Sequence, residues 1–418
     1  MTVRVAFLES NLSGSGYEAL QFSRRAGHQV VLVTSDLDYY LHAVSAPLDR
    51  SLLDEVVVCD TNDPAAVCAA LGDVAPVDAL LTMSELHVVT AAEAAALLGL
   101  AGSPAAAVRA ARDKPLARQL CRDAGIPTPG FQRVTSEAEI DPALLAGPCV
   151  VKPVDGLLST DVKLCGSADE ARGHVRMLLN DRVLVNSRGQ ALARAALIEE
   201  YLDGPEYSVE TLTWQGRTEV VAVTRKLLTP PPAFVEIGHA VPAPLPEHDR
   251  RACAELVGSA LAAIGYDFGA AHVEIRLTAA GPRIIEINCR PAGDRITRLA
   301  HLATGVDLPG QLIGMYLGRA PSTADRLNLG AAIVFLPSLP GEVVGIEGLE
   351  EAAAVEGIVD LSVYVAPGTE LAQVGDNTDR FGHVLAVGPD SDRALARAEH
   401  AAALLRIRTT DPALLARA

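Results

Sequence analysis

The stretch Ala271-His272-Val273-Glu274-Ile275-Arg276-Leu277, followed after five residues by Arg283-Ile284-Ile285-Glu286-Ile287-Asn288, decides both the fold class and the site. Apolar and polar side chains alternate along both halves, which is the pattern of half-buried β-strands. If residues 278–282 form the loop of a hairpin, Leu277 faces Arg283 across the ribbon.

This register sets Glu274 opposite Glu286, and His272 opposite Asn288, on one side of the ribbon. Two facing carboxylates destabilise a sheet unless a cation lies between them. Carboxylate and amide oxygens are hard ligands that suit Mg²⁺ together with substrate phosphates. We therefore predict that Glu274, Glu286 and Asn288 bind Mg²⁺, or Mn²⁺ as the alternative ion, with His272 as a neighbour. The alternative is an exposed hairpin with incidental acids. The other side is apolar and is expected to face the core: Val273, Ile275, Leu277, Ile285 and Ile287.

Length and composition limit the class of protein. The 418 residues suffice for roughly two to four domains. A net charge of −17 argues against broad binding to nucleic acids or anionic membranes. No apolar run approaches the roughly 20 residues of a membrane span, and residues 1–8 indicate a first strand rather than a signal peptide. The 7 cysteines are scattered and never spaced as C-x-x-C, which argues against disulfide frameworks and zinc sites and favours the reducing cytoplasm.

The chain divides into three predicted domains of α/β and α+β class. Alternating strands and helices indicate a Rossmann-like domain with a parallel sheet over residues 1–105. Residues 106–327 carry shorter strands and more turns, which predicts an α+β core of antiparallel hairpins. Residues 328–418 begin with an apolar run and end in an Ala-rich helix, which predicts a small C-terminal α+β domain. The strands of the first domain are expected at Val3–Leu8, Gln29–Thr34, Val56–Val58 and Ala79–Leu81.

A second segment with chemical meaning is the apolar strand Cys149–Pro153, which carries Lys152 to a turn at residues 154–161. A lysine there neutralises phosphate as a compact charge. Backbone N–H groups and the hydroxyls of Ser159 and Thr160 can cover phosphate oxygens. No Walker loop of the form G-x-x-x-x-G-K-[ST] occurs in the sequence. Taken alone, the strand is equally compatible with an edge lysine that reaches solvent.

A third segment is the apolar strand Leu197–Leu202, which ends in acids and is followed by a turn and a second strand beginning at Glu206. Such a hinge offers backbone N–H and C=O groups to the edge of an adenine, and Glu206 can accept hydrogen bonds from ribose hydroxyls. The same pattern is compatible with an ordinary hairpin.

Taken in order, these segments resemble the ATP-grasp superfamily, and the resemblance covers nearly the whole sequence. The stretch Phe234–Ala243 is similar to the F-x-E-x-G-H-x-x-P pattern of the L-amino-acid ligase (carboxylate–amine ligase) branch. Residues after 328 resemble the C-terminal domain of that branch. The ordered marks are Arg112-Asp113-Lys114, Val151-Lys152-Pro153, Glu199-Glu200-Tyr201-Leu202, Glu274, Glu286-Ile287-Asn288-Cys289-Arg290 and Asp379–Ala386.

The resemblance implies roles in binding ATP and Mg²⁺. The metal ligands are those predicted from the ribbon. The residues that would contact the phosphates are Lys114, Lys152, Ser159 and Lys226. Those that would line the adenine and ribose pocket are Glu199, Tyr201, Leu202 and Glu206.

The resemblance also implies roles at the reaction centre. Arg290 would stabilise the transferred phosphoryl group or the tetrahedral oxyanion, and Glu236 and His239 would bind substrate beside it. His239 is also compatible with an ordinary loop histidine. Further residues expected in the substrate pocket are Glu85, Gly293 and Asp294; for Glu85 the alternative is an acid at the start of a helix.

The implied reaction is ATP-dependent ligation of a carboxylate to an amine, with release of ADP and phosphate. A carboxylate is a poor acyl donor because its leaving group would be oxide, and phosphorylation converts that oxygen into a good leaving group. Phosphoryl transfer needs positioning and charge neutralisation. The expected substrates are small molecules, two amino acids or an amino acid and a related acid. A homodimer is expected from the family.

The predicted phosphate loop departs from the family pattern. It is less rich in Gly and Ser, Leu157 and Leu158 make it bulkier, and Asp155 and Asp161 place acids near phosphate.

Three other functions fit parts of the sequence. Gly14-Ser15-Gly16 follows the first strand, and Asp36 ends the second, which satisfies the dinucleotide fingerprint of an NAD-dependent oxidoreductase. That alternative leaves the acidic ribbon and the lysines without a role. A purine-pathway ligase or a biotin-carboxylase-like enzyme would share the nucleotide site, and an inert nucleotide-binding module would bind ATP without forming ADP.

Overall fold

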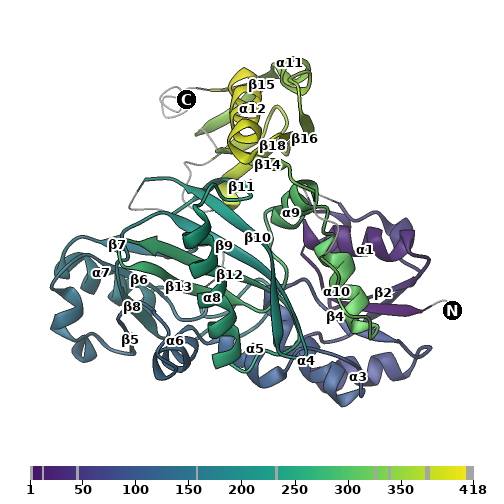
Figure 1. Cartoon of the computed structure of the whole chain (residues 1–418), viewed down its shortest axis with the longest axis horizontal. Helices are drawn as coiled ribbons and strands as arrows, with labels where there is room; N and C mark the ends of the chain where they lie inside the picture. The colour runs from purple at the N-terminus through teal and green to yellow at the C-terminus, as the bar shows by residue number, and fades with distance from the viewer. Residues whose placement is uncertain are drawn as a thin grey trace.

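The computed structural model describes residues 3–11, 14–43, 47–156, 159–230, 234–323, 327–337, 340–371 and 377–410. The N-terminal part lies on one side of a large central sheet, a smaller sheet lies on the other, and the C-terminal part projects from one end (Figure 1). Within the described residues, no helix has the length and apolar character that a membrane span requires.

The N-terminal part is the predicted parallel α/β unit. Its four strands lie in the order β3-β2-β1-β4, and all their pairings are parallel. The Asp63 carboxylate accepts a hydrogen bond from the Ala65 amide and caps the helix that starts at Pro64, as expected from the sequence. The strands are β1 (Arg4–Leu8), β2 (Gln29–Thr34), β3 (Glu55–Val58) and β4 (Ala79–Leu81). The helices are α1 (Ser15–Arg25), α2 (Asp38–Leu41), α3 (Pro64–Gly72), α4 (Val88–Leu97) and α5 (Ala105–Arg112).

A four-stranded antiparallel sheet, which we call the lid sheet, follows α6 (Lys114–Asp123). Its order is β5-β8-β6-β7, and α7 (Ala168–Asn180) packs on it with Val175 and Leu178 buried against Val151 and Ile198. The strands are β5 (Phe131–Val134), β6 (Cys149–Pro153), β7 (Lys163–Cys165) and β8 (Ala196–Glu200).

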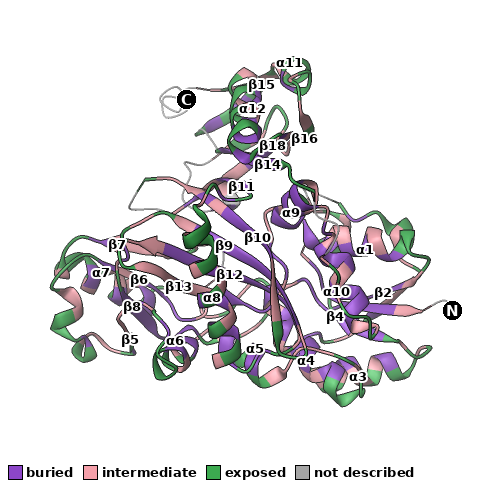
Figure 2. Cartoon of the chain, viewed as in Figure 1, coloured by how far each residue is buried: buried purple, intermediate pink, exposed green. Residues whose placement is uncertain are grey.

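The central sheet has eight strands in the order β13-β12-β9-β10-β11-β14-β18-β16, all antiparallel. One face is covered by α8 (Glu247–Ala263), and the other by α9 (Ile296–Thr304) and α10 (Leu308–Tyr316), which join it to the N-terminal unit in one apolar core (Figure 2). The strands are β9 (Glu206–Trp214), β10 (Arg217–Leu228), β11 (Glu236–Val241), β12 (Gly269–Thr278), β13 (Gly281–Asn288), β14 (Gly330–Pro337), β16 (Ile358–Val363) and β18 (Arg380–Gly388).

The C-terminal residues contribute to this sheet as well as forming their own. β14 pairs with β11, so the central sheet continues across the predicted boundary at residue 328. A separate three-stranded sheet has the order β17-β15-β19, and α12 (Ser391–Leu404) packs on β14 and β18. The three predicted domain ranges therefore stay a prediction. The remaining elements are β15 (Gly341–Glu347), α11 (Leu349–Ala353), β17 (Glu370–Leu371) and β19 (Arg406–Thr409).

The predicted hairpin exists, but its predicted loop is wrong. Thr278 pairs with Gly281, so only two residues separate the strands, and Leu277 faces Pro282 rather than Arg283. A β-bulge at Ile285 then adds one residue to β13 and shifts the register back. Consequently Glu274 faces Glu286 and His272 faces Asn288, as predicted.

The bulge also corrects the predicted apolar side of the ribbon. Ile284, not Ile285, is buried in the core with Val273, Ile275 and Ile287. Ile285 instead lines the cavity described below, and its backbone oxygen accepts a hydrogen bond from Arg118.

Candidate active site

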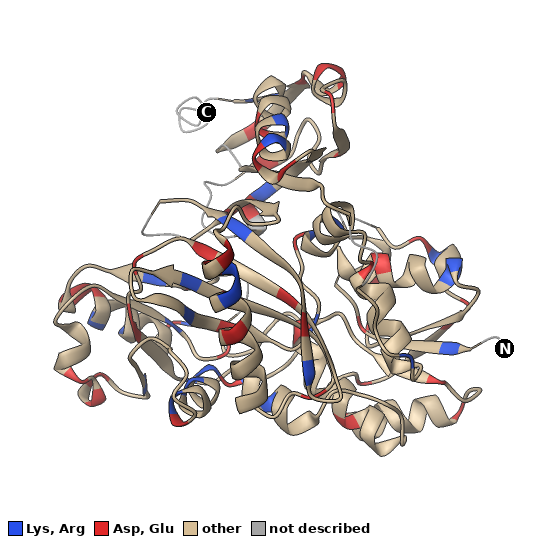
Figure 3. Cartoon of the chain, in the orientation of Figure 1, with Lys and Arg blue, Asp and Glu red and all other residues tan. Residues whose placement is uncertain are grey.

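A cavity of about 190 Å³ lies between the lid sheet and the central sheet. Charged residues occur on the strands that border it as well as on the outer helices (Figure 3). Most residues that the sequence analysis assigned to the site line this cavity: Lys114, Lys152, Ser159, Glu199, Tyr201, Leu202, Glu206, Glu236, Glu274, Glu286, Asn288, Arg290, Gly293 and Asp294. The four that do not line it are Glu85, Thr160, Lys226 and His239.

The three predicted metal ligands lie together on the cavity side of the β12–β13 hairpin. Lys226 Nζ lies 3.1 Å from Glu274 Oε2, and Lys114 Nζ lies 3.1 Å from Glu286 Oε1. Burial disfavours the charged form of Glu274, but Lys226 and His272 outweigh it and hold the pKa of that carboxyl well below its usual range. Lysine ammonium groups thus balance both carboxylates of the pair.

Lys226 lies beneath the cavity wall, among three carboxylates. Its Nζ is 2.9 Å from Glu206, 3.2 Å from Glu236 and 3.1 Å from Glu274. Burial disfavours its charge, yet the carboxylates of Glu236, Glu274 and Glu206 raise the pKa of Lys226 well above its usual value. The predicted contact between Lys226 and an ATP phosphate stays a prediction.

Lys152 shares one carboxylate with an arginine that the sequence analysis missed. Glu199 forms ion pairs with both Lys152 and Arg118, and all three side chains are buried. Burial lowers the pKa of Lys152 and is opposed by Glu199. Arg118 lies one helical turn after Lys114 on α6, so the i, i+4 spacing was a signal that could have found it.

Arg276 is a second residue that the sequence analysis did not assign. It extends from β12 to the hinge after the lid sheet, where its Nη1 donates a 2.8 Å hydrogen bond to the Leu202 oxygen. Its Nε lies 3.2 Å from Glu206 Oε2, and its guanidinium lies 5.3 Å from the rings of both Tyr201 and Phe234. These contacts fix the hinge that is predicted to hold adenine and ribose.

The turn after β6 holds its acids away from Lys114. Lys114 Nζ donates a 2.9 Å hydrogen bond to the Gly156 oxygen, while Asp155 pairs with Arg182 at 2.8 Å. Ser159 and Asp161 have left-handed backbones, with φ of 60° and 59°. Leu157 and Leu158 lie outside the described residues.

Glu85 and Arg290 form a buried ion pair beside the cavity. Glu85 also pairs with Arg112 at 2.9 Å. Burial disfavours the charged form of Glu85, but Arg290 and Arg112 outweigh it and lower the pKa of this carboxyl. Both oxygens of Glu85 therefore have guanidinium partners, and the predicted contact with a substrate amino group stays a prediction.

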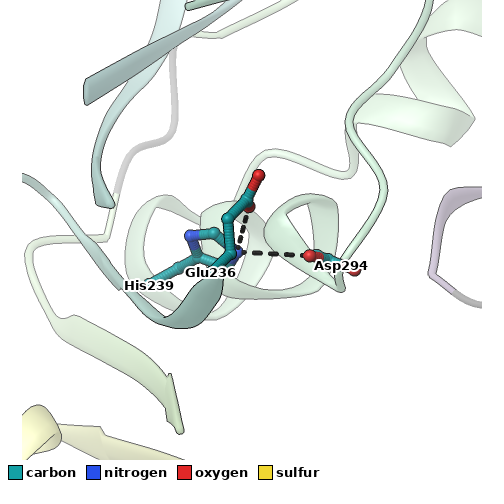
Figure 4. A group of neighbouring side chains, drawn as sticks. All are labelled: Glu236, His239 and Asp294. Carbon is teal, nitrogen blue, oxygen red and sulfur yellow. Dashed lines mark ion pairs between the residues drawn. The ribbon is translucent and has the colours of Figure 1, made fainter. Parts of the chain in front are cut away.

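His239 lies on β11, a strand that the sequence analysis did not predict, and so the alternative of a loop histidine is wrong. Its Nε2 lies 3.2 Å from Glu236 and 3.6 Å from Asp294 (Figure 4). Burial disfavours protonation, but Asp294 and Glu236 outweigh it and raise the pKa of His239. The cluster therefore places the imidazole of His239 directly behind two carboxylates that line the cavity.

The glycine loop of the dinucleotide fingerprint is explained by packing. A Cβ at Gly14 would lie 3.1 Å from the Arg295 nitrogen, and one at Gly16 would lie 2.1 Å from Ser10 Oγ. Gly14 therefore allows the N-terminal unit to touch the turn that follows Arg290. These glycines need no dinucleotide to account for them.

The crevice at the carboxyl ends of the parallel strands is filled by the chain itself. Arg188, from the loop after α7, forms a buried ion pair with Glu9 at the end of β1. The Glu9 carboxylate also accepts hydrogen bonds from Thr34, Ser35, Tyr40 and Thr61, at 2.5–3.1 Å.

Comparisons with known proteins agree with this geometry. The ATP-grasp domain matches residues 145–298, and the L-amino acid ligase C-terminal domain 2 matches residues 334–410. The uncharacterized protein y4rH of Sinorhizobium fredii is 30% identical over 85% of this chain and 75% of its own. The alanine–anticapsin ligase of Bacillus subtilis strain 168 is 28% identical over 56% of this chain, which spans about half (53%) of that relative.

Among solved structures, the L-amino acid ligase of Bacillus licheniformis superposes with a TM-score of 0.83 at 22% identity, covering 98% of this chain and 99% of its own. The sequence resemblance is thereby confirmed, and so is the predicted fold class. The chain belongs to the ATP-grasp superfamily, in the L-amino acid ligase branch, and is an ATP-dependent ligase that joins a carboxylate to an amine.

Proposed function

We propose that this enzyme joins two amino acids, or an amino acid and a related acid, through a peptide-like bond. ATP converts the carboxylate of the first substrate into an acyl phosphate, and the amine of the second substrate displaces the phosphate. The alanine–anticapsin ligase, whose name states an amino-acid substrate, supports this substrate class. The L-amino acid ligase C-terminal domain supports it as well.

One observation carries the proposal. The facing carboxylates of Glu274 and Glu286 line the same cavity as Lys114, Lys152 and Arg290. Phosphoryl transfer to a carboxylate brings several negative charges together, so a site for it needs cations and metal-binding oxygens within one water-poor space.

The donor set of the hairpin fits Mg²⁺, and Mn²⁺ as an alternative. Glu274, Glu286 and Asn288 offer carboxylate and amide oxygens from adjacent strands, and all three line the cavity. We assign the ion to these residues. When bound, it would neutralise charge on the ATP phosphates.

The lysines and the lid turn bind the phosphates in this proposal. Lys114 and Lys152 approach the cavity from α6 and β6, and Ser159 borders it from the turn after β6. Lys226, which is held by carboxylates, contributes positive charge from beneath. Because the fork of Arg290 offers several donors, it stabilises the acyl phosphate and the tetrahedral oxyanion that follows.

The adenosine and substrate ends of the cavity have different chemistry. Glu199, Tyr201, Leu202 and Glu206 border the hinge side, and we assign adenine and ribose to them, with Glu199 itself acting through Lys152 and Arg118. Glu236, Gly293 and Asp294 line another part of the cavity wall, with His239 in contact with Glu236 and Asp294. We assign the amino-acid substrate to that part, with Glu85 orienting Arg290.

We place the enzyme in the cytoplasm, where ATP is supplied and thiols stay reduced; all 7 cysteines are free. We also expect a homodimer. The proposed binding partners of the enzyme are the small-molecule acid and amine. The net charge of −17 argues against nucleic acids or anionic membranes as partners.

The experiment is to measure ADP and phosphate release with ATP and Mg²⁺ across all pairs of the common amino acids. Amino-acid ligation predicts release that requires both substrates, together with a dipeptide detected by mass spectrometry. Phosphoribosylamine with glycine, and bicarbonate alone, are included to test the purine-pathway and carboxylase alternatives. Release with one of these and with no amino-acid pair would overturn the proposal.

A further inference from the structure

One residue of the C-terminal part reaches the substrate side of the cavity. Arg380, at the start of β18, donates a hydrogen bond to Asp294 from each terminal nitrogen. Nη1 lies 2.7 Å from Oδ2, and Nη2 lies 2.8 Å from Oδ1. Two parallel, charge-assisted hydrogen bonds fix the orientation of a carboxylate as well as its charge. The side chains of both residues are mostly buried.

Arg380 is itself firmly held. Its guanidinium lies 4.0 Å from the centre of the Phe335 ring, and its Nε donates a 2.7 Å hydrogen bond to the Asn377 oxygen. Asn377 borders the cavity, and its Oδ1 accepts a 2.9 Å hydrogen bond from the Glu236 amide. Asn377 therefore forms part of the cavity wall, and Arg380 is bonded directly to it.

The carboxylate that Arg380 grips belongs to a strained turn. Asp294 and Arg295 are successive non-glycine residues with left-handed backbones, at φ of 48° and 58°. Such residues are sparse unless the surroundings determine their conformation. Both of their side chains have partners in the C-terminal part, because Arg295 Nη1 lies 3.2 Å from Asp360.

Asp294 in turn contacts the buried histidine. Its Oδ2, which accepts from Arg380, is 3.6 Å from His239 Nε2, and that nitrogen is 3.2 Å from Glu236. A chain of contacts thus runs from Arg380 through Asp294 and His239 to Glu236, and both carboxylates line the cavity. Figure 4 shows the last three of these side chains.

We propose that Arg380 is a positioning residue for the carboxylate substrate, acting through Asp294 on His239 and Glu236. The inference rests on the proposed amino-acid ligation. It gives the C-terminal part a defined task, since that part fixes the geometry of the substrate wall. The contacts of Arg380 are to Asn377, Glu236, Asp294 and Phe335, none of which we assign to the nucleotide, so we expect nucleotide binding to be independent of Arg380.

Steady-state kinetics of Arg380→Ala tests the split between substrate and nucleotide. We expect the KM of the carboxylate substrate to rise about 10- to 100-fold, the loss expected for hydrogen bonds to a buried charge. The Kd of ATP, measured by calorimetry, stays within about twofold of the wild-type value. Arg380→Lys recovers only part of the loss, because one ammonium cannot span both carboxylate oxygens.

The matched control is Arg397→Ala. Arg397 lies on α12 in the same part of the chain and pairs with Glu356 away from the cavity, so its loss tests general destabilisation. A double-mutant cycle with Asp294→Asn completes the set. Because Arg380 acts through Asp294, the double variant should lose no more than Asp294→Asn alone.

An NMR measurement separates this inference from the proposed function. The ring-nitrogen shifts of His239 should change alike in Arg380→Ala and Asp294→Asn and stay unchanged in Arg397→Ala. Wild-type enzyme that releases no ADP with any amino-acid pair defeats the proposed function, while the NMR result still decides the role of Arg380. Equal kinetics for Arg380→Ala and Arg397→Ala, additive losses in the cycle, or unchanged His239 shifts would overturn the inference.

Discussion

At the scale of single residues, the site pairs nearly every buried acid with a cation. Lys226 forms ion pairs with three carboxylates, Glu199 with two cations, and Glu85 with two arginines. Removing one member of such a set leaves an uncompensated buried charge, which costs more than the pair contributes.

Glu286 is the member where an effect on activity should be separable from stability. Its side chain borders the cavity, and its ion pair with Lys114 is not fully buried. We expect Glu286→Ala to lower kcat on the order of 10²–10³-fold, as for other groups that stabilise transition-state charge. ADP release gives the rate, and Glu255→Ala, on the exposed side of α8, is the control. Turnover near the wild-type rate would remove Glu286 from the metal site.

His87 should make the folded state sensitive to acid. Burial lowers the pKa of His87 from 6.5 to about 4, so between these values the unfolded chain binds one proton more than the folded chain. The contribution of His87 to the free energy of unfolding is therefore fully present above pH 6.5 and is lost as the pH drops toward 4. At 1.36 kcal/mol per pKa unit, the loss is about 3 kcal/mol.

Urea unfolding of His87→Gln across pH 4–7 measures this effect. The variant should lack the His87 share of the slope, whereas His400→Gln, an exposed residue of α12, should keep it. A slope that is the same in all three proteins would contradict the assignment.

At this scale, local periodicity could predict the facing pair of the hairpin, whereas residues such as Glu236, His239 and Arg290 were assigned only from the family resemblance. Alternation along residues 271–288 was enough to set Glu274 opposite Glu286. Arg380 and Arg188 could not be found this way, because their partners are distant in the sequence. Arg380 pairs with Asp294, 86 residues earlier, and Arg188 pairs with Glu9 in the first strand's exit. Ion pairs between distant segments depend on the packing of whole elements, which periodicity does not encode.

At the scale of elements, the predicted pairing of Glu274 with Glu286 in the hairpin β12–β13 was correct although the predicted loop was wrong. A tight two-residue connection and the bulge at Ile285 shift the register by one residue in opposite senses. The alternation of apolar and polar residues reveals neither feature. One extra apolar residue among Ile284, Ile285 and Ile287 leaves a pattern that still looks like a regular strand. β11 was missed because Gly238 and the buried His239 break the apolar run expected of a strand.

The loop after α7 is the element that fastens the lid sheet to the N-terminal unit. Arg188 pairs with Glu9 and lies over the Tyr39 ring at 4.6 Å, and Gln190 donates hydrogen bonds to Asn62 and to the Leu86 oxygen. We expect Arg188→Ala to lower the free energy of local opening of residues 182–193 by roughly 3–5 kcal/mol, because Glu9 stays buried without its cation while this loop is closed.

Hydrogen exchange tests that expectation locally. Amides of residues 182–193 should exchange at least about tenfold faster in Arg188→Ala, whereas those of β9 should not change. Arg217→Ala removes an exposed pair with Glu219 and serves as the control. Unchanged protection of residues 182–193 would show that Arg188 does not hold the loop.

At the scale of the whole molecule, the central sheet makes the C-terminal part inseparable from the rest. β14 covers the edge of β11, and the strand that carries His239 would otherwise present unpaired N–H and C=O groups. The three predicted domain ranges, which came from the pattern of strands and helices, stay a prediction. The shared sheet could not be predicted, because no local pattern tells which distant strand completes an edge.

Truncation after residue 327 tests this dependence. The shortened chain should aggregate, detected by light scattering, and should have a Tm lower by about 10 °C or more, since it loses an edge strand and the Arg380 contacts. The full-length protein under the same conditions is the reference. A monomeric, fully active fragment of residues 1–327 would contradict it.

The strand pairing between β11 and β14, together with the grip of Arg380 on Asp294, sets rules for protein engineering. A chimera made by exchanging C-terminal domains between relatives at residue 328 would cut through the central sheet. It would also separate Arg380 from the turn at residues 293–295 that carries its partner Asp294. Recombination should instead transfer three segments as one cassette, namely β11, the turn at residues 293–295 and everything from β14 onward. Libraries built on that unit would diversify which acid is accepted while leaving the nucleotide half untouched.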